Sequence, residues 1–258
     1  MKYFVVDAFA EKVFGGNPAG VCVLEKPLDA ELMQTIAKEN NLSETAFVYP
    51  EKDYYCLRWF TPADEIDLCG HATLGTAYVI SNFVEKDTKI MKFHTKSGVL
   101  TVEKKGDLFE MDFPSRMPEK IDTIEKVAEV IGIRPMETHL SRDLVVVLQN
   151  EEQVKNIQPD FVKMKQLGIG LGVIVTAKGE REDFVSRYFA PELGVNGDPV
   201  TGSSHSTLIP FWSERLKKQK MVARQLSQRG GILYCENAGQ RVKVSGSAVL
   251  YMIGELQI

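Results

Sequence analysis

Hydrophobic and polar residues alternate with a period of two along several short stretches in the first half of the chain. This alternation predicts β-strands over residues 3–9, 21–24, 45–49, 54–60, 89–95, 98–104 and 108–113. Two other stretches have the spacing of a helix: one from an N-cap at Asp29 through Glu39, the other from Gly70 through Ile80. Residues 14–20 are rich in Gly, Asn and Pro and are expected to form a loop. The first half is therefore predicted to contain many strands and few helices.

The second half shows a similar order of patterns. We expect helices near residues 122–131 and 158–167, and a longer helix that opens at Gly202 and runs to about Lys217. The lysines at 217–220 are expected to lie in the solvated last turn of that helix. Strands are predicted over residues 144–148, 172–176, 184–189, 231–236, 240–244 and 248–253.

A short motif occurs once in each half. Residues 58–62 read Arg-Trp-Phe-Thr-Pro, and residues 187–191, which lie 129 positions later, read Arg-Tyr-Phe-Ala-Pro. A glycine that opens an apolar helix follows each motif, at Gly70 and Gly202. Further on, residues 98–103 match residues 231–236 at an offset of 133. Offsets that change so little, in the same order, indicate two copies of one α/β unit with a boundary near residues 114–118.

The balance of strands and helices predicts the fold class. Because strands outnumber helices in each half, each unit is expected to be a curled sheet wrapped around one long helix, which gives an α+β protein. Two similar domains that face one another form a cleft, where ligands commonly bind. The sequence therefore predicts an active-site cleft between two related domains.

Composition and charge exclude several classes of protein. A net charge of −4 gives no reason to expect binding to nucleic acid or to an anionic membrane. No apolar run approaches the length of a membrane span, and Met1 leads directly into a predicted strand rather than into a signal peptide. The four cysteines have no metal-ligand spacing with the four histidines. Reduced thiols in a cytoplasmic protein, with no metal, are the simplest expectation.

The two helix starts, residues 70–73 and 202–205, are candidate anion sites. Unpaired amides and the positive end of the helix dipole favour a negative charge there, and a substrate carboxylate would fit. The alternative is that Gly70 and Gly202 only turn the chain and that the neighbouring hydroxyl residues only cap helices. The presence of both starts at matching positions makes a ligand site as good an interpretation as the purely structural one.

Four side chains are candidates for acid–base chemistry, each with a structural alternative. His71 titrates near neutrality but could be a structural histidine. Glu44 enters a predicted buried strand, where burial would raise its pKa, although the pattern alone favours a solvated carboxylate at a strand edge. Asp198 precedes a proline and could form a turn. Cys69 at a helix start could be a reactive thiol or a small buried apolar residue.

Six stretches together resemble the phenazine-biosynthesis isomerase-like family, within the diaminopimelate-epimerase fold. They run in the family's order over nearly the whole chain and comprise residues 7–9 (Asp-Ala-Phe), 16–20 (Gly-Asn-Pro-Ala-Gly), 43–47 (Ser-Glu-Thr-Ala-Phe), 60–62 (Phe-Thr-Pro), 69–73 (Cys-Gly-His-Ala-Thr) and 198–203 (Asp-Pro-Val-Thr-Gly-Ser).

The resemblance implies two similar domains, at residues 1–114 and 115–246, each a barrel-like mixed sheet around a central helix. It implies that a strand at about 247–258 returns to complete the first sheet and that the protein is a homodimer. It implies a small carboxylate-bearing substrate and no cofactor, with Glu44 as the acid–base residue helped by His71, Asp198 and Ser203. The residues that would line the substrate site are Asn17, Cys69, Gly70, Ala72, Gly202 and Ser204.

Three hypotheses remain open from the sequence. The first is a cofactor-free isomerase in which Glu44 moves a proton between carbons. The second is an epimerase or racemase with Cys69 as one base; related enzymes use two cysteines, and Gly202 stands at the second position here. The third is a metabolite-binding protein of the same fold without turnover, because one fold can carry many functions.

Overall fold

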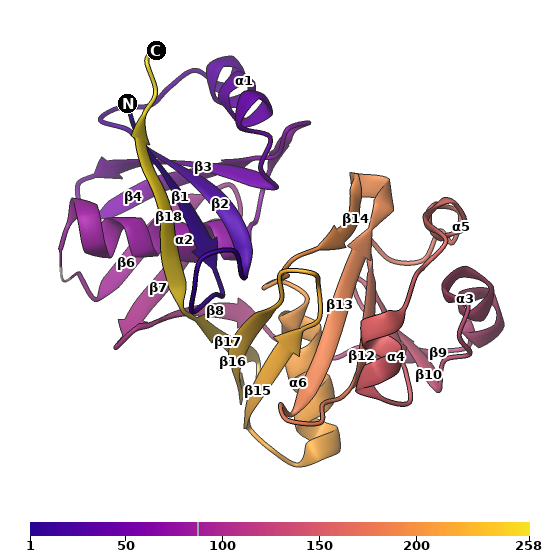
Figure 1. Cartoon of the computed structure of the whole chain (residues 1–258). Helices are drawn as coiled ribbons and strands as arrows, with labels where there is room; N and C mark the ends of the chain where they lie inside the picture. The colour runs from indigo at the N-terminus through magenta and orange to yellow at the C-terminus, as the bar shows by residue number, and fades with distance from the viewer. Residues whose placement is uncertain (87) are drawn as a thin grey trace. The chain divides into compact units, whose positions relative to one another are not determined.

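The computed structural model of the chain describes residues 1–86 and 88–258, which form two compact units. Unit 1 comprises Met1–Asp112 together with Ser245–Ile258, and unit 2 comprises Phe113–Val244. In each unit strands predominate over helices (Figure 1). The predicted α+β class is confirmed.

Unit 1 is built on a mixed sheet. Its strands are β1 (Lys2–Ala8), β2 (Asn17–Val23), β3 (Glu44–Glu51), β4 (Tyr54–Phe60), β5 (Glu65–Ile66), β6 (Ile90–Thr95), β7 (Gly98–Lys105), β8 (Leu108–Pro114) and the returning β18 (Ala248–Glu255). β1 pairs antiparallel with both β18 and β2, and β2 pairs parallel with β3. The sheet continues through β4, parallel to β6, and on to β7 and β8. Parallel neighbours require a crossover, and helices provide it.

Helix α2 (Gly70–Val79) is the buried centre of unit 1. It connects β4 and β5 to β6, continues into the π-helical turn η1 (Ile80–Val84), and packs against β1, β2 and β3. Nearly all its side chains are buried, and Leu74 and Ala77 are wholly so. A helix that is apolar on all faces is stable only inside a core. The other helix, α1 (Ala30–Asn40), begins at Asp29, whose side chain accepts a hydrogen bond from the Glu31 amide, and connects β2 to β3.

Unit 2 repeats this order of pairing. Its elements are β9 (Glu119–Ile121), α3 (Ile124–Ile131), β10 (Glu137–Leu140), β11 (Leu144–Val147), α4 (Glu151–Asn156), α5 (Phe161–Lys165), β12 (Val173–Lys178), β13 (Phe184–Ala190), the 3-10 turn η2 (Pro191–Leu193), β14 (Val195–Asp198), α6 (His205–Leu216), β15 (Lys220–Gln225), β16 (Gly231–Ala238) and β17 (Arg241–Gly246). β11 is parallel to β12, β12 is antiparallel to β13, and β13 is parallel to β15 with α6 between them. The pairs β2–β3, β3–β4 and β4–β6 have the same order and directions in unit 1.

The repeated Arg-aromatic-Phe motif has the same local geometry in both units. Residues two apart in a strand lie on one face, so the arginine is placed over the phenylalanine. The guanidinium carbon of Arg58 lies 5.2 Å from the ring centre of Phe60, and that of Arg187 lies 4.9 Å from the ring centre of Phe189. The arginine partners differ. Arg58 binds Glu65 through two hydrogen bonds, whereas Arg187 donates to the carbonyl of Ile157. The motif is therefore a packing element of the sheet in both copies.

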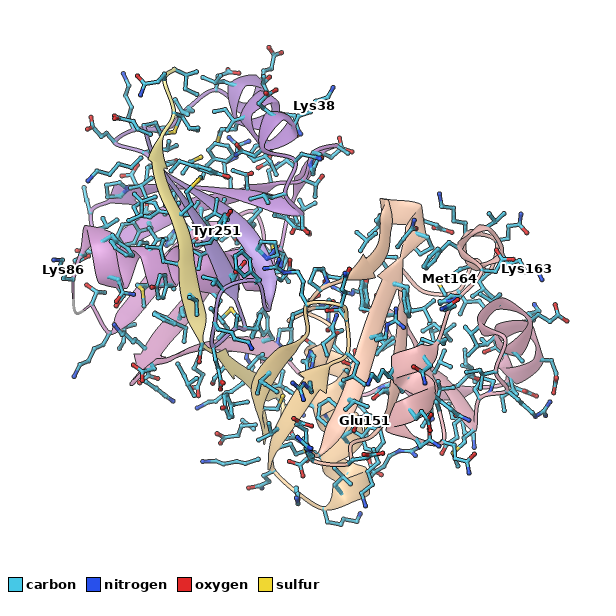
Figure 2. The ribbon with its side chains drawn as sticks, viewed as in Figure 1. Lys38, Lys86, Glu151, Lys163, Met164 and Tyr251 are labelled. Atoms are coloured by element: carbon cyan, nitrogen blue, oxygen red, sulfur yellow. The ribbon has the colours of Figure 1, made fainter. Side chains whose placement is uncertain are left out.

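The apolar core of unit 2 lies between its sheet and its short helices. Side chains from α3, α4 and α5 join those of β11, β12 and β13 in one buried cluster. On α5, Met164 is buried in this cluster, whereas the neighbouring Lys163 is exposed (Figure 2). In the part of the chain that the structure describes, no helix combines the length and the apolar character that crossing a membrane requires.

Several elements differ from the sequence-based expectation. The stretch predicted as a loop at 14–20 already contains the start of β2. The lysines expected in the last turn of a helix lie after its end instead, and Lys220 is the first residue of β15. The second central helix begins at His205, three residues later than predicted, and ends at Leu216. Lys217 then adopts a left-handed conformation, with φ of 55°, and terminates the helix. Strands β5, β9, β10 and β14 and helix α4 were not predicted, because each is short, and β15 was not predicted because it begins in the lysine run.

Gly16 directly precedes Asn17, and its conformation can be tested by substitution. Its φ is +62°, and an added Cβ would lie 2.1 Å from the carbonyl oxygen of Ala8. Gly106 has a similar φ of +64° with no atom within 4 Å of an added Cβ. Left-handed strain costs about 1 kcal/mol, and forced overpacking costs a further ~1–3 kcal/mol. We expect Gly106→Ala to lower the free energy of unfolding by about 1 kcal/mol and Gly16→Ala by about 2–4 kcal/mol, measured by urea denaturation. Equal losses would show that the contact with Ala8 does not constrain the turn.

Candidate active site

The pairing of β2 with β3 places Asn17 and Glu44 together in unit 1. The two strands are parallel, with Ala19 opposite Glu44, so their first residues lie at the same end of the sheet. Asn17 is the first residue of β2 and is fully buried, and Glu44 is the first residue of β3. The Glu44 side chain is 16% exposed, although its Oε2 atom, which faces His71, is buried. Helix α2 begins with Gly70 and His71 and brings the imidazole to these two residues.

His71 lies between three polar side chains. Its Nε2 atom is 3.0 Å from Oε2 of Glu44. Its Nδ1 atom is 3.2 Å from Nδ2 of Asn17 and 3.5 Å from Sγ of Cys69. The N–H of Nε2 does not point directly at Oε2, so the contact with Glu44 is an ion pair rather than an aligned hydrogen bond. A carboxylate held in this way keeps lone pairs available for a substrate proton.

Cys69, His71 and Glu44 also offer metal-ligand atoms, which lie within 4.8 Å of one another. A metal ion bound by all three would need one imidazole nitrogen to face both of the other ligands. Instead, the cysteine faces Nδ1 and the glutamate faces Nε2. The imidazole therefore lies between the thiol and the carboxylate, an arrangement that does not suit a metal ion shared by all three groups.

The environment of His71 determines its charge. Burial opposes the charged imidazolium, whereas the Cys69 sulfur and the Glu44 carboxylate favour it, and together these effects raise the pKa of His71 well above its usual value of 6.5. Burial, reinforced by the nearby Glu44 carboxylate, raises the pKa of the Cys69 thiol, whereas the imidazolium of His71 lowers it. An imidazolium needs an acceptor at Nδ1. The amide of Asn17 can provide one by turning its oxygen towards the ring.

The pKa of His71 should therefore depend on Glu44. In Glu44→Gln the carboxylate that favours the imidazolium is lost, and we expect the pKa of His71 to fall from its raised value, which NMR of the ring nitrogens would follow. Because the folded-state pKa is raised, protonation of His71 contributes stability that is complete below about pH 6.5 and is lost as the pH rises through the folded-state pKa. His205, whose pKa is lowered to about 4 by its burial, serves as the internal reference. A pKa that stays high in Glu44→Gln would assign the charge to a Cys69 thiolate.

A second polar cluster in unit 2 surrounds the loop between β14 and α6. Asp198 ends β14, and its carboxylate accepts a hydrogen bond from the Thr201 hydroxyl. The side chain of Gln225 holds both ends of this turn: it donates to the Asp198 carbonyl at 2.7 Å and accepts from the Thr201 amide at 2.9 Å. Gln225 is fully buried. The turn is therefore held in place by Gln225, the last residue of β15. The Asp198 side chain is partly exposed.

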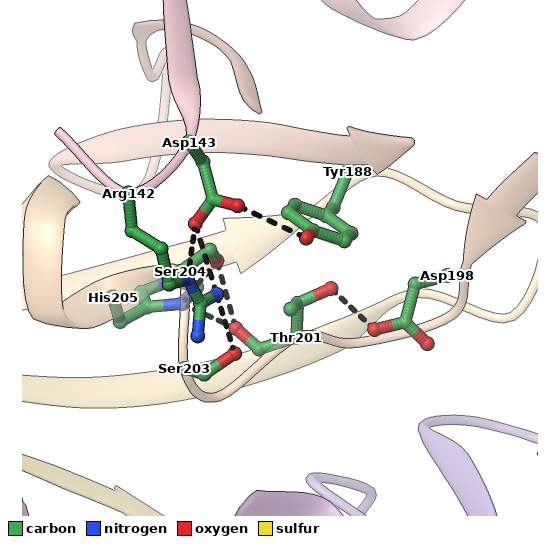
Figure 3. A network of polar contacts seen from close by, with 8 residues as sticks. All are labelled: Arg142, Asp143, Tyr188, Asp198, Thr201, Ser203, Ser204 and His205. Carbon is green, nitrogen blue, oxygen red and sulfur yellow. Dashed lines mark hydrogen bonds and ion pairs between the residues drawn. The ribbon is translucent and has the colours of Figure 1, made fainter. Parts of the chain in front are cut away.

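Ser203 and Ser204 occupy different environments in this loop (Figure 3). The Ser204 hydroxyl donates to the Thr201 carbonyl at 2.8 Å and is buried, and Nδ1 of His205 donates to the same carbonyl at 2.9 Å. Both side chains thus hold the turn that precedes α6. Ser203 is partly exposed, and its oxygen accepts a hydrogen bond from Nη2 of Arg142 at 3.2 Å.

Arg142 and Asp143 were not singled out from the sequence, yet they belong to this cluster. They lie in the turn between β10 and β11. The Asp143 carboxylate is buried and accepts hydrogen bonds from Arg142 and, at 3.2 Å, from the hydroxyl of Tyr188. The only sequence signal was a pair of opposite charges directly before the apolar run 144–148. Sixty-one positions separate Arg142 from Ser203, and no sequence pattern reports such a contact.

The structure brings the candidate residues together in two groups. In unit 1, Asn17, Glu44 and Cys69 each contact the imidazole of His71, and Gly70 and Ala72 are buried in the first turn of α2. In unit 2, Asp198, Gly202, Ser203 and Ser204 share the loop before α6. The first group has the features of an acid–base centre, and the second has hydroxyl, carboxylate and guanidinium groups that can position a polar ligand.

Comparisons with known proteins agree over almost the whole chain. Residues 6–254 match the family model described as phenazine biosynthesis-like protein. An uncharacterized isomerase of Pseudomonas aeruginosa is 48% identical over 258 residues, which cover 100% of this chain and 99% of that protein. The crystal structure of a phenazine biosynthesis protein PhzF family member from Enterococcus faecalis has a TM-score of 0.98 at 50% identity and covers 100% of this chain and 99% of that one.

A more distant match supports the fold alone. The structure of a probable proline racemase from Agrobacterium radiobacter is 10% identical and has a TM-score of 0.67, over 100% of this chain and 93% of that one. The fold is therefore shared with racemase-like proteins as well as with the first family.

Proposed function

The chain belongs to the phenazine biosynthesis-like protein family, and from this we propose that it is an isomerase that moves a carbon-bound proton of a small carboxylate-bearing metabolite. The observation that supports the chemistry best is the partly exposed Glu44 carboxylate, which is held 3.0 Å from the buried imidazole of His71. A general acid or base must lie within hydrogen-bond reach of the proton it transfers, and Glu44 is the partly exposed carboxylate of this cluster.

The reaction has two proton transfers through one carboxylate. Glu44 takes a proton from a substrate carbon: the C–H bond breaks, its electron pair delocalises into the substrate, and a Glu44 O–H bond forms. The Glu44 carboxyl proton can exchange with solvent at this stage, and the same carboxyl group then returns a proton to another carbon on the same face, which restores the carboxylate. The imidazolium of His71 balances the charge of Glu44 before and after each transfer. No electrons are gained or lost, so the reaction needs no redox cofactor, and we propose that no other cofactor takes part.

We propose that Ser203 and Asp198 of unit 2 serve the same reaction by holding the substrate. Their hydroxyl and carboxylate groups are partly exposed, and the backbone around them is fixed by Gln225 and Ser204. In the same proposal the amide of Asn17 turns its oxygen towards Nδ1 when His71 is protonated. The amides of Gly70, Ala72, Gly202 and Ser204 contribute a positive potential at the two helix starts.

The proposal is tested by solvent exchange. Wild-type protein is incubated in deuterated buffer with a panel of small carboxylates, and deuterium at carbon is followed by NMR and mass spectrometry. The expected result is enzyme-dependent incorporation that persists after treatment with EDTA. Saturable binding of a panel member without any exchange would replace the isomerase with a metabolite-binding protein.

A second candidate function is an epimerase or racemase in which Cys69 is one of the bases. The contact of 3.5 Å between Sγ and Nδ1 of His71 favours it, because the imidazole could take the thiol proton. Two features oppose it: burial raises the pKa of the Cys69 thiol, and the position of a second cysteine holds Gly202. Exchange that stops in Cys69→Ala but continues in Glu44→Gln would establish this function instead.

We also propose that the protein acts as a homodimer in the cytoplasm. The four cysteines are unpaired thiols, which is the usual state of cysteines in a reducing compartment. Sedimentation equilibrium should give twice the chain mass of 28.9 kDa, and a single-chain mass at micromolar concentration would contradict the dimer.

A further inference from the structure

Arg142 has features of a ligand-binding group that the proposed chemistry does not use. Its Nε and Nη2 atoms donate to one oxygen of Asp143, at 3.0 and 2.9 Å, and Nη2 also donates to Ser203. Within the described residues, nothing accepts a hydrogen bond from Nη1. The side chain is 28% exposed, whereas that of Asp143 is only 1% exposed. One edge of the guanidinium is thus held from inside the protein, and the other edge is available.

Asp143 is itself held firmly, so the position of Arg142 is well defined. The other oxygen of Asp143 accepts a hydrogen bond from Tyr188 on β13, whose ring is also buried. Figure 3 shows the guanidinium between the Asp143 carboxylate and the Ser203 hydroxyl. A planar guanidinium fixed along one edge presents its remaining N–H groups in a defined direction, which suits a carboxylate.

The hydrogen bond to Ser203 gives that hydroxyl a direction as well. Because the oxygen accepts from Nη2 of Arg142, the hydroxyl hydrogen remains available to donate outward. Ser204, by contrast, uses its hydrogen for the carbonyl of Thr201. Of the two adjacent serines, only Ser203 offers a donor to an anion.

We infer that Arg142, together with the Ser203 hydroxyl, binds the carboxylate of the substrate. This inference rests on the proposed function for the class of substrate, and it adds the cationic group that recognises the charge. A guanidinium and a hydroxyl side by side provide two donors for the two oxygens of a carboxylate. A neutral amide in place of the carboxylate loses the charge interaction and would bind more weakly.

The test compares a carboxylate with its neutral amide. Benzoate and benzamide are titrated into the full chain at constant ionic strength, and binding is followed by NMR. Wild type should bind benzoate at least tenfold more tightly than benzamide. Arg142→Gln should remove this difference, Arg142→Lys should keep part of it, and Ser203→Ala should weaken benzoate binding severalfold. Arg134→Gln, which removes the charge of an arginine paired with Glu125 elsewhere in unit 2, is the control and should bind as wild type does.

Two results would overturn the inference. One is equal affinity of wild type for benzoate and benzamide, and the other is unchanged benzoate binding in Arg142→Gln. That variant leaves the buried Asp143 without its cation and could unfold; the affinities of Arg142→Lys and Ser203→Ala then decide, and wild-type affinity in both would refute the inference. A benzoate preference without solvent exchange refutes the isomerase alone, and exchange without that preference refutes the role of Arg142 alone.

Discussion

Glu44→Gln is expected to lower the rate of solvent deuterium exchange by about 10³-fold, because it removes the group that carries the proton. A positioned general base contributes roughly 10²–10⁴-fold to such a step. Glutamine has nearly the same shape as glutamate, so β3 and the contacts of Asn17 should persist. The measurement is the initial rate of deuterium incorporation at carbon, with the substrate identified by the wild-type screen.

The matched control is Glu51→Gln, at the other end of the same strand. Glu51 is exposed, and no catalytic role is proposed for it. It should exchange at the wild-type rate. A Glu44→Gln rate within threefold of wild type would rule out Glu44 as the base, and the comparison with Cys69→Ala would then show whether the thiol has that role.

His71→Gln is expected to reduce exchange by about 10²-fold. It removes the cation that faces the Glu44 carboxylate but retains a polar side chain of similar size. The pH dependence separates this role from a structural one. In wild type the rate should fall as the pH rises through the pKa of His71, which is raised well above 6.5, and this descending limb should be absent from His71→Gln.

The folded fraction of His71→Gln and of wild type is measured by thermal melting alongside the exchange rates. If His71→Gln lost activity only in proportion to its folded fraction, or kept the descending limb, the imidazole would be a structural group and not the partner of Glu44.

The sequence predicted the fold class well because its signals are local. Alternation in residues 54–60 and 184–189 gave the central strands, and the glycine-led apolar segment at Gly70 gave the buried helix. The start of α6 was misplaced because Gly202 and Ser203 look like a helix start, whereas the hydroxyl of Ser204 and the ring of His205 hold the Thr201 carbonyl and delay the helix to His205. Strand β15 begins at the last lysine of a run whose composition resembles the end of a helix. Exposed and buried side chains nevertheless alternate along this strand.

For the two polar clusters, the sequence indicated some of the residues but not their contacts. The resemblance named Glu44, Cys69 and His71, but their contacts depend on tertiary structure. Asn17 and His71 are 54 positions apart, and only the parallel pairing of β2 and β3 beside α2 brings them together. The sequence did not indicate a site at Arg142, because a pair of opposite charges in a turn is usually exposed to solvent. No local pattern shows that Asp143 is buried.

The return of β18 to β1 also determines when unit 1 can be completed during synthesis. Lys2 lies opposite Glu255 in that pairing, and the N-terminal amine donates to the carbonyl of Leu256. Unit 2 is continuous in sequence and inserted into unit 1, so all of its residues leave the ribosome before the last strand of unit 1 does. Until then β1 lacks one of its two neighbours, and its unpaired edge is open to other strands. The acid–base centre, built on the strand next to β1, thus belongs to the unit whose sheet is completed last.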